Sequence, residues 1–509
     1  MRKLISVFLA FVMMLGLMPA DFAAEPYTLD IYWVGNGDKP EIRAGVEAAV
    51  NEYIEPIIGA NVVFHIVGWD DWKTQVVDVL TDKAARKATK MDLVFTAEWE
   101  YYSDLVEAKA LFVLDDLLDQ FGKGILSSLP EGFWNGIRIN KGIYGVPTNK
   151  ELCVPMGFIV NKTAADAIGW DLENSEIKTT ADLEPWLAKY KEMYPDKYPY
   201  LMDMNPAGRW VDEPWINDWS GTENNAVAMR MAKLEDGSFD ETVYSIFETP
   251  EEEEHIRLMY KWVQDGYISP ENAGMTKGDA EDLFGRGEFL VFTQPLKGNN
   301  IKAVEMYSEK HEAGSEPFEV AEIIMQPKYI VTAHTAGSMF GIPTNCQNLD
   351  AAMKYLNLMH SDAKLVNLML FGVEGVNYTK LDDRKVTLNP DAAWYTVHGG
   401  AWTVGDVTLQ YVLENEDPDK NNKLIEFAED AAETDSLGFR FNKKKLSAET
   451  EAVAEAVRTY VNPLLCGVAD PDDPEKGIEA MKAALKAAGI DKLVEAAQKQ
   501  YNEWKAAQK

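Results

Sequence analysis

The sequence has 509 residues, of which 83 are acidic and 49 basic, so its formal net charge is −34. Such a charge repels nucleic acid phosphates and anionic membrane surfaces, and we expect neither as a partner. The length exceeds the roughly 250 to 300 residues that usually share one hydrophobic core, which predicts at least two lobes.

The N-terminus has the three regions of a secretory signal peptide. Residues 1–3 carry positive charge, residues 4–17 are apolar, and small residues end at Ala24. We therefore predict that residues 1–24 are a signal peptide and that the mature protein is secreted across the cytoplasmic membrane. It would reside in the periplasm or on the outer face of the cell membrane. No lipidation cysteine is evident, since the first cysteine is Cys153.

The first part of the mature chain alternates strands and helices. Apolar alternation and turn residues predict strands at 29–34, 61–67 and 92–96, with helices near 42–54 and 71–80 between them. This alternation favours a mainly parallel sheet that is covered by helices on both faces.

The pattern starts again after a predicted hairpin over residues 137–146. A strand at 158–160, a helix around 183–190, a helix at 251–265 and a strand at 289–292 predict a second α/β lobe. Beyond residue 350 the chain is predicted to be mostly helical, and its last amphipathic segments are interrupted at Gly489.

The sequence gives no sign of a metal site, a cofactor or a catalytic motif. Its three cysteines are far apart, its six histidines are scattered, and the runs H-E-x-x-H, G-x-S-x-G and G-x-x-x-x-G-K-[ST] do not occur. We therefore expect no enzyme. The alternative is an exported glycoside hydrolase that uses two carboxylates. The 83 acidic residues always supply some pair at a suitable distance, so their abundance alone is no evidence for it.

Several segments resemble the family 1 extracellular solute-binding proteins of ABC importers, the maltodextrin-binding type. The closest likeness is to the LipO-like subgroup, which has a C-terminal helical domain of unknown function. The resemblance covers nearly the whole mature chain, and the segments that carry it are 68–72 (GWDDW), 92–97 (DLVFTA), 112–122 (FVLDDLLDQFG), 145–151 (GVPTNKE), 284–288 (FGRGE) and 489–492 (GIDK).

The resemblance implies a periplasmic-binding-protein type II-like fold, with two α/β lobes joined by hinge strands and extra C-terminal helices. Chain crossings are expected near residues 151–155, 292–295 and 341–345. The first lobe would then comprise residues 25–152 plus 293–342. The second would comprise 153–292 plus 343–509, with the helical extension at about 415–509.

The family also implies a ligand between the lobes, where strand-end loops converge. A sugar presents apolar C–H faces and a rim of hydroxyls, so its site needs flat aromatic rings beside planar polar side chains. For each aromatic candidate the alternative is a residue of the core. The candidates are Trp33, Asn36, Trp69, Asp70, Trp99, Tyr101, Asn149, Glu151, Asn205, Arg209, Trp210, Gln294, Trp394, His398 and Trp402. Of these, Trp394 and Trp402 are the first choices.

The function implied is that of an extracytoplasmic receptor. It would be a monomer that captures a carbohydrate, an oligosaccharide in particular, by hinge closure and delivers it to the permease subunits of an ABC transporter. A receptor of the same fold for a peptide or a polyamine is the remaining alternative.

Overall fold

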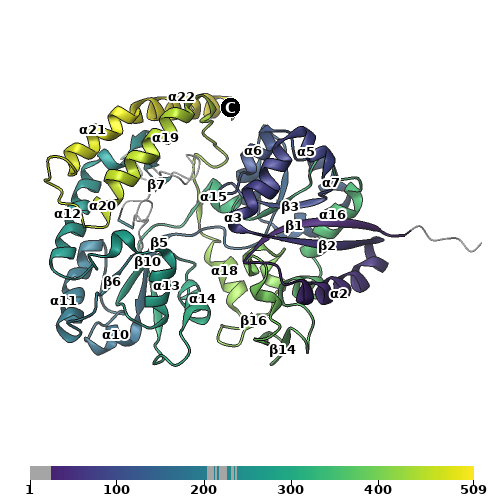
Figure 1. Cartoon of the computed structure of the whole chain (residues 1–509), viewed down its shortest axis with the longest axis horizontal. Coiled ribbons are helices and arrows are strands. Elements are labelled where there is room, and N and C mark those ends of the chain that lie inside the picture. The colour runs from purple at the N-terminus through teal and green to yellow at the C-terminus, as the bar shows by residue number, and fades with distance from the viewer. Residues whose placement is uncertain are drawn as a thin grey trace, which may run out of the picture.

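The computed structural model of the chain describes residues 25–202, 211–212, 215–216, 226–230, 234 and 238–508. The predicted signal peptide lies outside these residues. Two lobes stand side by side, each built on its own sheet, and a layer of C-terminal helices lies over one of them (Figure 1). None of the helices in the described ranges is long and apolar enough to span a bilayer.

The first lobe contains a five-stranded sheet with the order β2-β1-β3-β13-β4. β1 pairs in parallel with β2 and with β3, whereas β13 runs antiparallel to both β3 and β4. The strands are β1 (Tyr27–Gly35), β2 (Ala60–Gly68), β3 (Leu93–Thr96), β4 (Gly145–Pro147) and β13 (Met339–Gly341). The predicted parallel strands are therefore confirmed, and the sheet is completed by two antiparallel strands.

Helices from both halves of the chain cover this sheet. α2 (Pro40–Ile58) places Val46, Val50 and Ile54 on it, one buried residue per turn. α16 (Leu349–Met359) and α17 (Ala363–Phe371) enter the same hydrophobic core. The remaining helices of this lobe are α3 (Trp69–Trp72), η1 (Lys73–Val77), α4 (Asp78–Thr81), α5 (Lys83–Ala88), α6 (Tyr102–Glu107), α7 (Asp115–Phe121), α8 (Lys123–Ser128), α9 (Glu131–Ile137), α15 (Thr332–Thr335), η5 (Trp394–Thr396), η6 (Ala401–Thr403), η7 (Val407–Leu409) and α18 (Lys420–Phe427).

The second lobe is built on a four-stranded sheet with the order β11-β5-β10-β6. Its strands are β5 (Met156–Asn161), β6 (Tyr200–Leu201), β10 (Val291–Pro295) and β11 (Val320–Ile324). Both faces are buried, because Phe158 and Val160 enter one core whereas Ile159 and Phe292 enter another. The helices are α10 (Lys162–Ala167), η2 (Thr180–Leu183), α11 (Glu184–Met193), η3 (Ile246–Glu248), α12 (Pro250–Gln264), η4 (Asn272–Gly274), α13 (Lys277–Gly285) and α14 (Ile301–Lys310).

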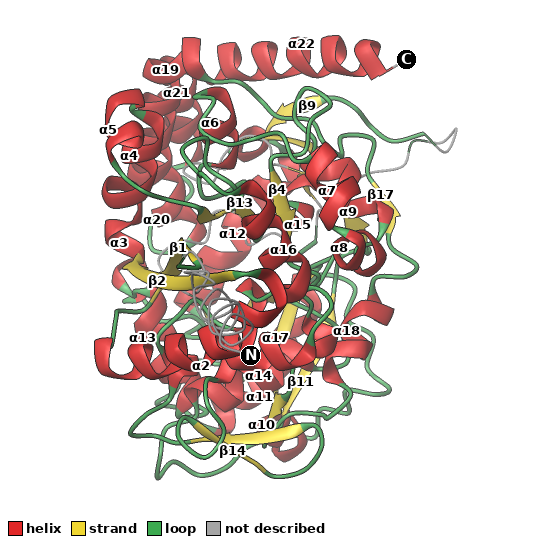
Figure 2. Ribbon diagram, turned by 90° about the vertical axis from the view of Figure 1, so that its right-hand side faces the viewer, coloured by secondary structure: helices red, strands yellow, loops and turns green. Residues whose placement is uncertain are grey.

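The C-terminal helices share a hydrophobic core with second-lobe segments that include β8, β9 and α12. Gly489 separates α21 from α22 with φ of +95°, in agreement with the predicted interruption. The elements are α19 (Ser447–Ala456), η9 (Val457–Val461), α20 (Asn462–Leu465), α21 (Ile478–Ala488) and α22 (Ile490–Gln508); η8 (Lys444–Leu446) leads into them. Figure 2 shows α22 extended across the top of the molecule.

Three small sheets complete the part of the chain that the structure describes. One consists of β7 (Trp215–Ile216), β8 (Val227–Arg230) and β9 (Val243–Ser245), and another of β14 (Tyr378–Lys380), β15 (Lys385–Leu388) and β16 (Val412–Leu413). The third pairs β12 (Tyr329–Ile330) in parallel with β17 (Ala432–Glu433). The segment beyond residue 350 is therefore less uniformly helical than the sequence suggested.

The lobe boundaries differ from the expected ones in two places. The first expected crossing agrees with the structure, because the chain leaves the first sheet at Pro147 and enters the second at Met156. β10 and β11, however, belong to the second sheet, so residues 293–324 are not part of the first lobe. Residues 349–413 return to the first lobe, where α16 and α17 share its core. Paired β12 and β17 lie in the later crossings.

Candidate functional site

Three tryptophans lie together at one edge of the first sheet. The ring centroids of Trp69 and Trp402 are 6.2 Å apart with the planes 16° from parallel, and Trp99 lies 5.9 Å from Trp69 and 6.0 Å from Trp402. Trp69 and Trp99 remain 38% and 39% exposed, whereas Trp402 is partly buried. We call these three residues the tryptophan platform.

Parallel strands bring the platform together. Because β1, β2 and β3 run in the same direction, their carboxyl ends share one edge. Trp69 directly follows β2, and Trp99 follows β3 by three residues. Trp402 arrives from residues 397–403, which lie against the end of β1, where Gly35 forms a β-bridge with His398. A Cβ atom at Gly35 would come within 2.5 Å of the carbonyl oxygen of Val397, so glycine permits this approach.

Polar contacts fix the edges of two of the rings. The indole N–H of Trp69 donates to Oδ1 of Asn36 at 3.2 Å, and that of Trp99 donates to the carbonyl of Gly337 at 2.9 Å. The backbone N–H of Asn36 donates in turn to Val397. Because the polar edges are anchored to protein, the exposed parts of the rings are free to stack against an apolar face.

The structure places several predicted residues around this platform. Asn36 contacts it directly, and the exposed Asp70 follows Trp69 at the start of α3. Tyr101 ends the Trp99 loop with φ of +62° and is partly buried. Whether these residues touch a ligand stays a prediction.

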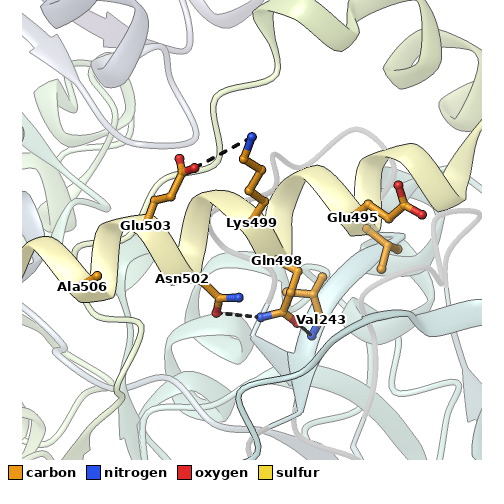
Figure 3. A pocket seen from close by; sticks show the side chains of 8 residues that line it. Val243, Glu495, Gln498, Lys499, Asn502, Glu503 and Ala506 are labelled. Atoms are coloured by element: carbon orange, nitrogen blue, oxygen red, sulfur yellow. Dashed lines mark hydrogen bonds and ion pairs between the residues drawn. The ribbon is translucent and has the colours of Figure 1, made fainter.

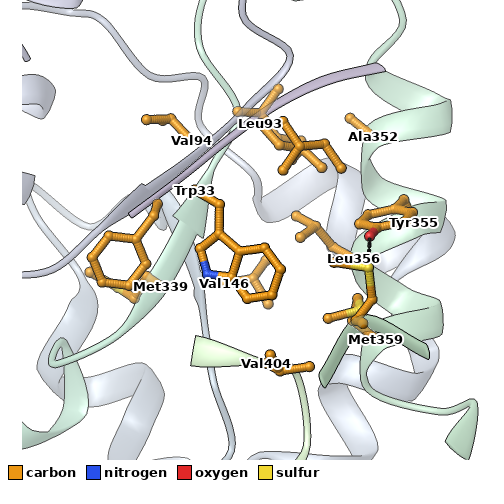
Figure 4. Packing of buried hydrophobic residues seen from close by; sticks show 14 of the residues in the cluster. Trp33, Leu93, Val94, Val146, Met339, Ala352, Tyr355, Leu356, Met359 and Val404 are labelled. Atoms are coloured by element: carbon orange, nitrogen blue, oxygen red, sulfur yellow. Dashed lines mark hydrogen bonds between the residues drawn. The ribbon is translucent and has the colours of Figure 1, made fainter. Parts of the chain in front are cut away.

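Three other candidates belong to the core and not to the surface. Trp33, Trp394 and His398 are each at most 1% exposed. Trp33 donates to Oγ1 of Thr403 at 3.0 Å and stacks on His398 at 4.3 Å, and Figure 4 shows it among the packed residues of the first lobe. Trp394 donates to the carbonyl of Met369 at 2.7 Å. Burial lowers the pKa of His398 to about 4, so it is neutral. For these residues the alternative of a core role applies.

The crossing near residue 150 contains two further candidates. Asn149 is buried and donates to Oδ1 of Asp406 at 3.1 Å. Glu151 lies between Lys150 and Lys297, at 2.8 and 3.8 Å. The pKa of Glu151 falls to about 2 because these two ammonium groups outweigh the effect of its burial.

Glu151 is part of a chain of charges that joins the lobes. Lys297 also contacts Glu305 of α14 at 2.8 Å, and Glu305 contacts Lys420 of α18 at 3.3 Å. Lys420 contacts Glu416 at 2.7 Å. The crossing, the second lobe and the later part of the first lobe are thereby linked in one network.

The other candidates are not brought to the platform. Gln294 is buried in β10 of the second sheet. Asn205, Arg209 and Trp210 lie outside the described residues.

Two glutamates beside Trp99 were missed by the sequence reasoning. Glu98 forms a 2.6 Å ion pair with Arg440, which comes from a segment more than 300 residues away. Burial raises the pKa of Glu100 to about 7. Their position could have identified both glutamates, since each directly flanks a tryptophan at the end of a strand. Nothing in the sequence pointed to Arg440.

A separate surface pocket of about 640 Å³ lies along α22 (Figure 3). None of the lining residues that the structure describes is aromatic. The side chain of Gln498 accepts from the N–H of Val243 and donates to Asn502, and Lys499 pairs with Glu503. These contacts use polar groups that a sugar would need, so the platform is the better candidate. Among the residues that the structure describes, no group of three or more His, Cys, Asp or Glu could hold a metal ion.

Comparison with known proteins agrees with this architecture. Residues 435–506 match a family described as a domain of unknown function (DUF3502). A Streptococcus pneumoniae protein named carbohydrate ABC transporter substrate-binding protein is 27% identical over 495 residues, which cover 95% of this chain and 92% of that protein. The chain is therefore similar over nearly its whole length to a carbohydrate ABC transporter substrate-binding protein.

Solved structures of solute-binding proteins share the fold of this chain. The N-glycan transport solute binding protein NgtS of S. pneumoniae superposes with a TM-score of 0.78 at 23% identity, covering 95% of this chain and all of that chain. A human milk oligosaccharide (HMO) binding protein from Bifidobacterium longum infantis has a TM-score of 0.61 at 16% identity, covering 94% and 99%. The predicted fold class and the predicted resemblance to solute-binding proteins are confirmed.

Proposed function

We propose that this solute-binding protein captures an oligosaccharide on the tryptophan platform and delivers it to the permease of an ABC importer. The observation that carries the proposal is the platform itself: three indoles side by side, two of them more than a third exposed, at the carboxyl edge of a parallel sheet. Large exposed aromatic rings with anchored polar edges suit the C–H faces of a pyranose.

The relatives support a carbohydrate as the ligand. The pneumococcal relative is named for carbohydrate transport, and NgtS has been crystallised with Man5GlcNAc and with Man1GlcNAc. Two glycans of different length suggest a site that takes extended chains, and three adjacent rings offer stacking positions for more than one sugar unit.

Capture involves closure of the lobes. The hinge consists of the crossings at residues 148–155 and 325–338, with the paired strands β12 and β17. A ligand that contacts both lobes stabilises the closed form. The permease then distinguishes the closed form from the open one. In this proposal the protein is a monomer, is exported by residues 1–24, acts at the periplasmic or outer face of the membrane, and releases its ligand chemically unchanged.

The test is thermal shift and calorimetry with Man5GlcNAc, a human milk oligosaccharide, a cationic peptide and spermidine. A ligand that binds only the native state raises the melting temperature. We expect a shift with a glycan, and its loss in the Trp69→Ala and Trp402→Ala variants. Trp186→Ala is the matched control, because this indole stacks on Trp170 in a core of the second lobe.

Two results overturn the proposal. A response to the peptide or to spermidine without a response to any glycan changes the ligand class. Release of shorter sugars from a bound glycan, measured by chromatography, identifies an enzyme in place of a receptor.

A further inference from the structure

The C-terminal segment reaches the loop that carries Trp99. Nε of Arg440 lies 2.6 Å from Oε2 of Glu98, and the two side chains are only 13% and 10% exposed. Glu98 directly precedes Trp99. An ion pair with so little exposure is screened much less by water than a surface pair, and its geometry is restricted by packing.

Both Nη atoms of Arg440 also donate to the first lobe. Nη2 donates to the carbonyl of Gly136 at 2.8 Å, and Nη1 donates to that of Arg138 at 3.2 Å. The guanidinium lies 5.7 Å from the ring centroid of Tyr102. A planar fork with several fixed partners has one orientation, which a lysine in its place could not reproduce.

The flanking residues anchor Arg440 in the C-terminal domain. Phe439 and Phe441 are buried, at 1% and 7% exposed, in the core that α19 to α22 share with second-lobe segments. Arg440 stands between them with its side chain on the first lobe. A residue between two buried rings cannot move without the helical domain moving too.

The opposite side of the Trp99 loop is held by a hinge crossing. The N–H of Glu98 donates to the carbonyl of Ala336 at 2.8 Å, and the indole of Trp99 donates to Gly337. Ser103 donates to Oε1 of Glu98 at 2.5 Å. Both carboxylate oxygens of Glu98 are therefore hydrogen-bonded. The segments that contain Ala336 and Arg440 together hold the Trp99 loop.

We infer that Arg440 is a positioning residue for Trp99, through which the domain of unknown function sets the geometry of the glycan-binding platform. This inference rests on the proposed function. It gives the domain a role: because the helical domain packs on the second lobe and Trp99 belongs to the first, rotation of the lobes about the hinge acts on the Trp99 loop through the Glu98–Arg440 pair. Ligand stacked on Trp99 is then coupled to the position of α19 to α22.

A double-mutant cycle tests the inference. Arg440→Met is expected to weaken binding of Man5GlcNAc, or of the panel glycan that binds, by about tenfold. If Arg440 acts through Trp99, the same change causes no further loss in a Trp99→Ala background. Glu98→Gln is the second variant, which keeps the shape of the side chain and removes its charge. Equal losses with and without Trp99 would overturn the inference.

Lys444→Met is the matched control. Lys444 also links this segment to the first lobe, through a 2.6 Å pair with Glu107, but the pair is exposed and Glu107 lies outside the Trp99 loop. Exposed pairs contribute little, so affinity is expected to stay within about twofold of the wild type. A loss equal to that of Arg440→Met would overturn the inference in favour of general loosening of the domain.

A ligand-free measurement separates this inference from the proposed function. In protein labelled with 5-fluorotryptophan, the ¹⁹F resonance of Trp99 is assigned from a Trp99→Phe variant. Arg440→Met is expected to shift or broaden this resonance and to leave that of Trp186 unchanged. An unchanged Trp99 resonance overturns the positioning role even if glycan binds, and a shifted one supports it even if no glycan binds.

Discussion

Replacement of Glu305 by Gln should destabilise the protein at neutral pH and have a much smaller effect in acid. Glu305 contacts Lys297 at 2.8 Å and Lys420 at 3.3 Å. Folding lowers the pKa of Glu305 from 4.5 to about 2, chiefly because the ammonium groups of Lys297 and Lys420 outweigh its burial. That change corresponds to about 3 kcal/mol of stability at pH 7.

The other members of the network limit the loss. Without Glu305, Lys297 keeps Glu151 at 3.8 Å and Lys420 keeps Glu416 at 2.7 Å, so neither ammonium is left without a counter-charge. A buried pair that loses one partner usually costs about 3 to 5 kcal/mol, and we expect the lower end of that range.

The sign of the pH dependence follows from the lowered pKa. The stabilisation is complete above pH 4.5 and is lost as the pH falls toward about 2, because the folded carboxylate must then accept a proton. The difference between wild type and variant in urea unfolding, followed by circular dichroism, should therefore shrink between pH 7 and pH 3.

Glu449→Gln is the control for this experiment, since Glu449 pairs with Lys492 at the surface and should change stability little. If the Glu305→Gln variant unfolds at the same urea concentration as the wild type at pH 7, Glu305 does not stabilise the folded state as proposed. A destabilisation of equal size at both pH values would also refute the reasoning.

Three further predictions follow from buried contacts. Trp394→Ala should lower the free energy of unfolding by about 3 to 5 kcal/mol in urea titrations, because it leaves a cavity at a fully buried position. Glycan affinity should stay intact, and a loss of affinity in the folded variant would contradict the core role of Trp394. Gly35→Ala should lower the melting temperature in calorimetry, because its Cβ meets the carbonyl of Val397 at 2.5 Å; an unchanged value would show that residues 397–403 can yield. Glu100→Gln should raise the melting temperature more at pH 8 than at pH 5, because burial raises the pKa of Glu100 to about 7 and the charged carboxylate opposes folding. Equal effects at both pH values would exclude the ionisation of Glu100 as the cause.

Local patterns predicted the elements and part of the site. Strand periodicity located β1, β2 and β3, and their parallel pairing explains why Trp69 and Trp99 meet. The same periodicity also indicates that Trp33 is buried, because Trp33 follows Leu29 and Ile31 on the buried face of β1. A position near the end of a strand therefore does not by itself expose a side chain.

Long-range pairing could not be predicted in the same way. Trp394 and Trp402 lie on similar 3₁₀ turns, and only the packing of α17 and β1 makes one a core residue and the other part of the platform. The return of residues 349–413 to the first lobe has no local signal either. Arg440 joins Glu98 across 342 residues, a contact that depends on the whole fold.

The first lobe is built from segments that are far apart in the sequence, which has a consequence for folding. The indole of Trp33 bonds to Thr403 across 370 positions, and β13 separates β3 from β4 in the sheet. Contacts between such distant positions form slowly, because a long loop must close before they are gained. The nascent N-terminal third therefore cannot complete its own core until about four-fifths of the polypeptide has been synthesised. The second sheet, whose strands all lie between Met156 and Ile324, has no such requirement, so the lobe that begins first in the sequence is completed last.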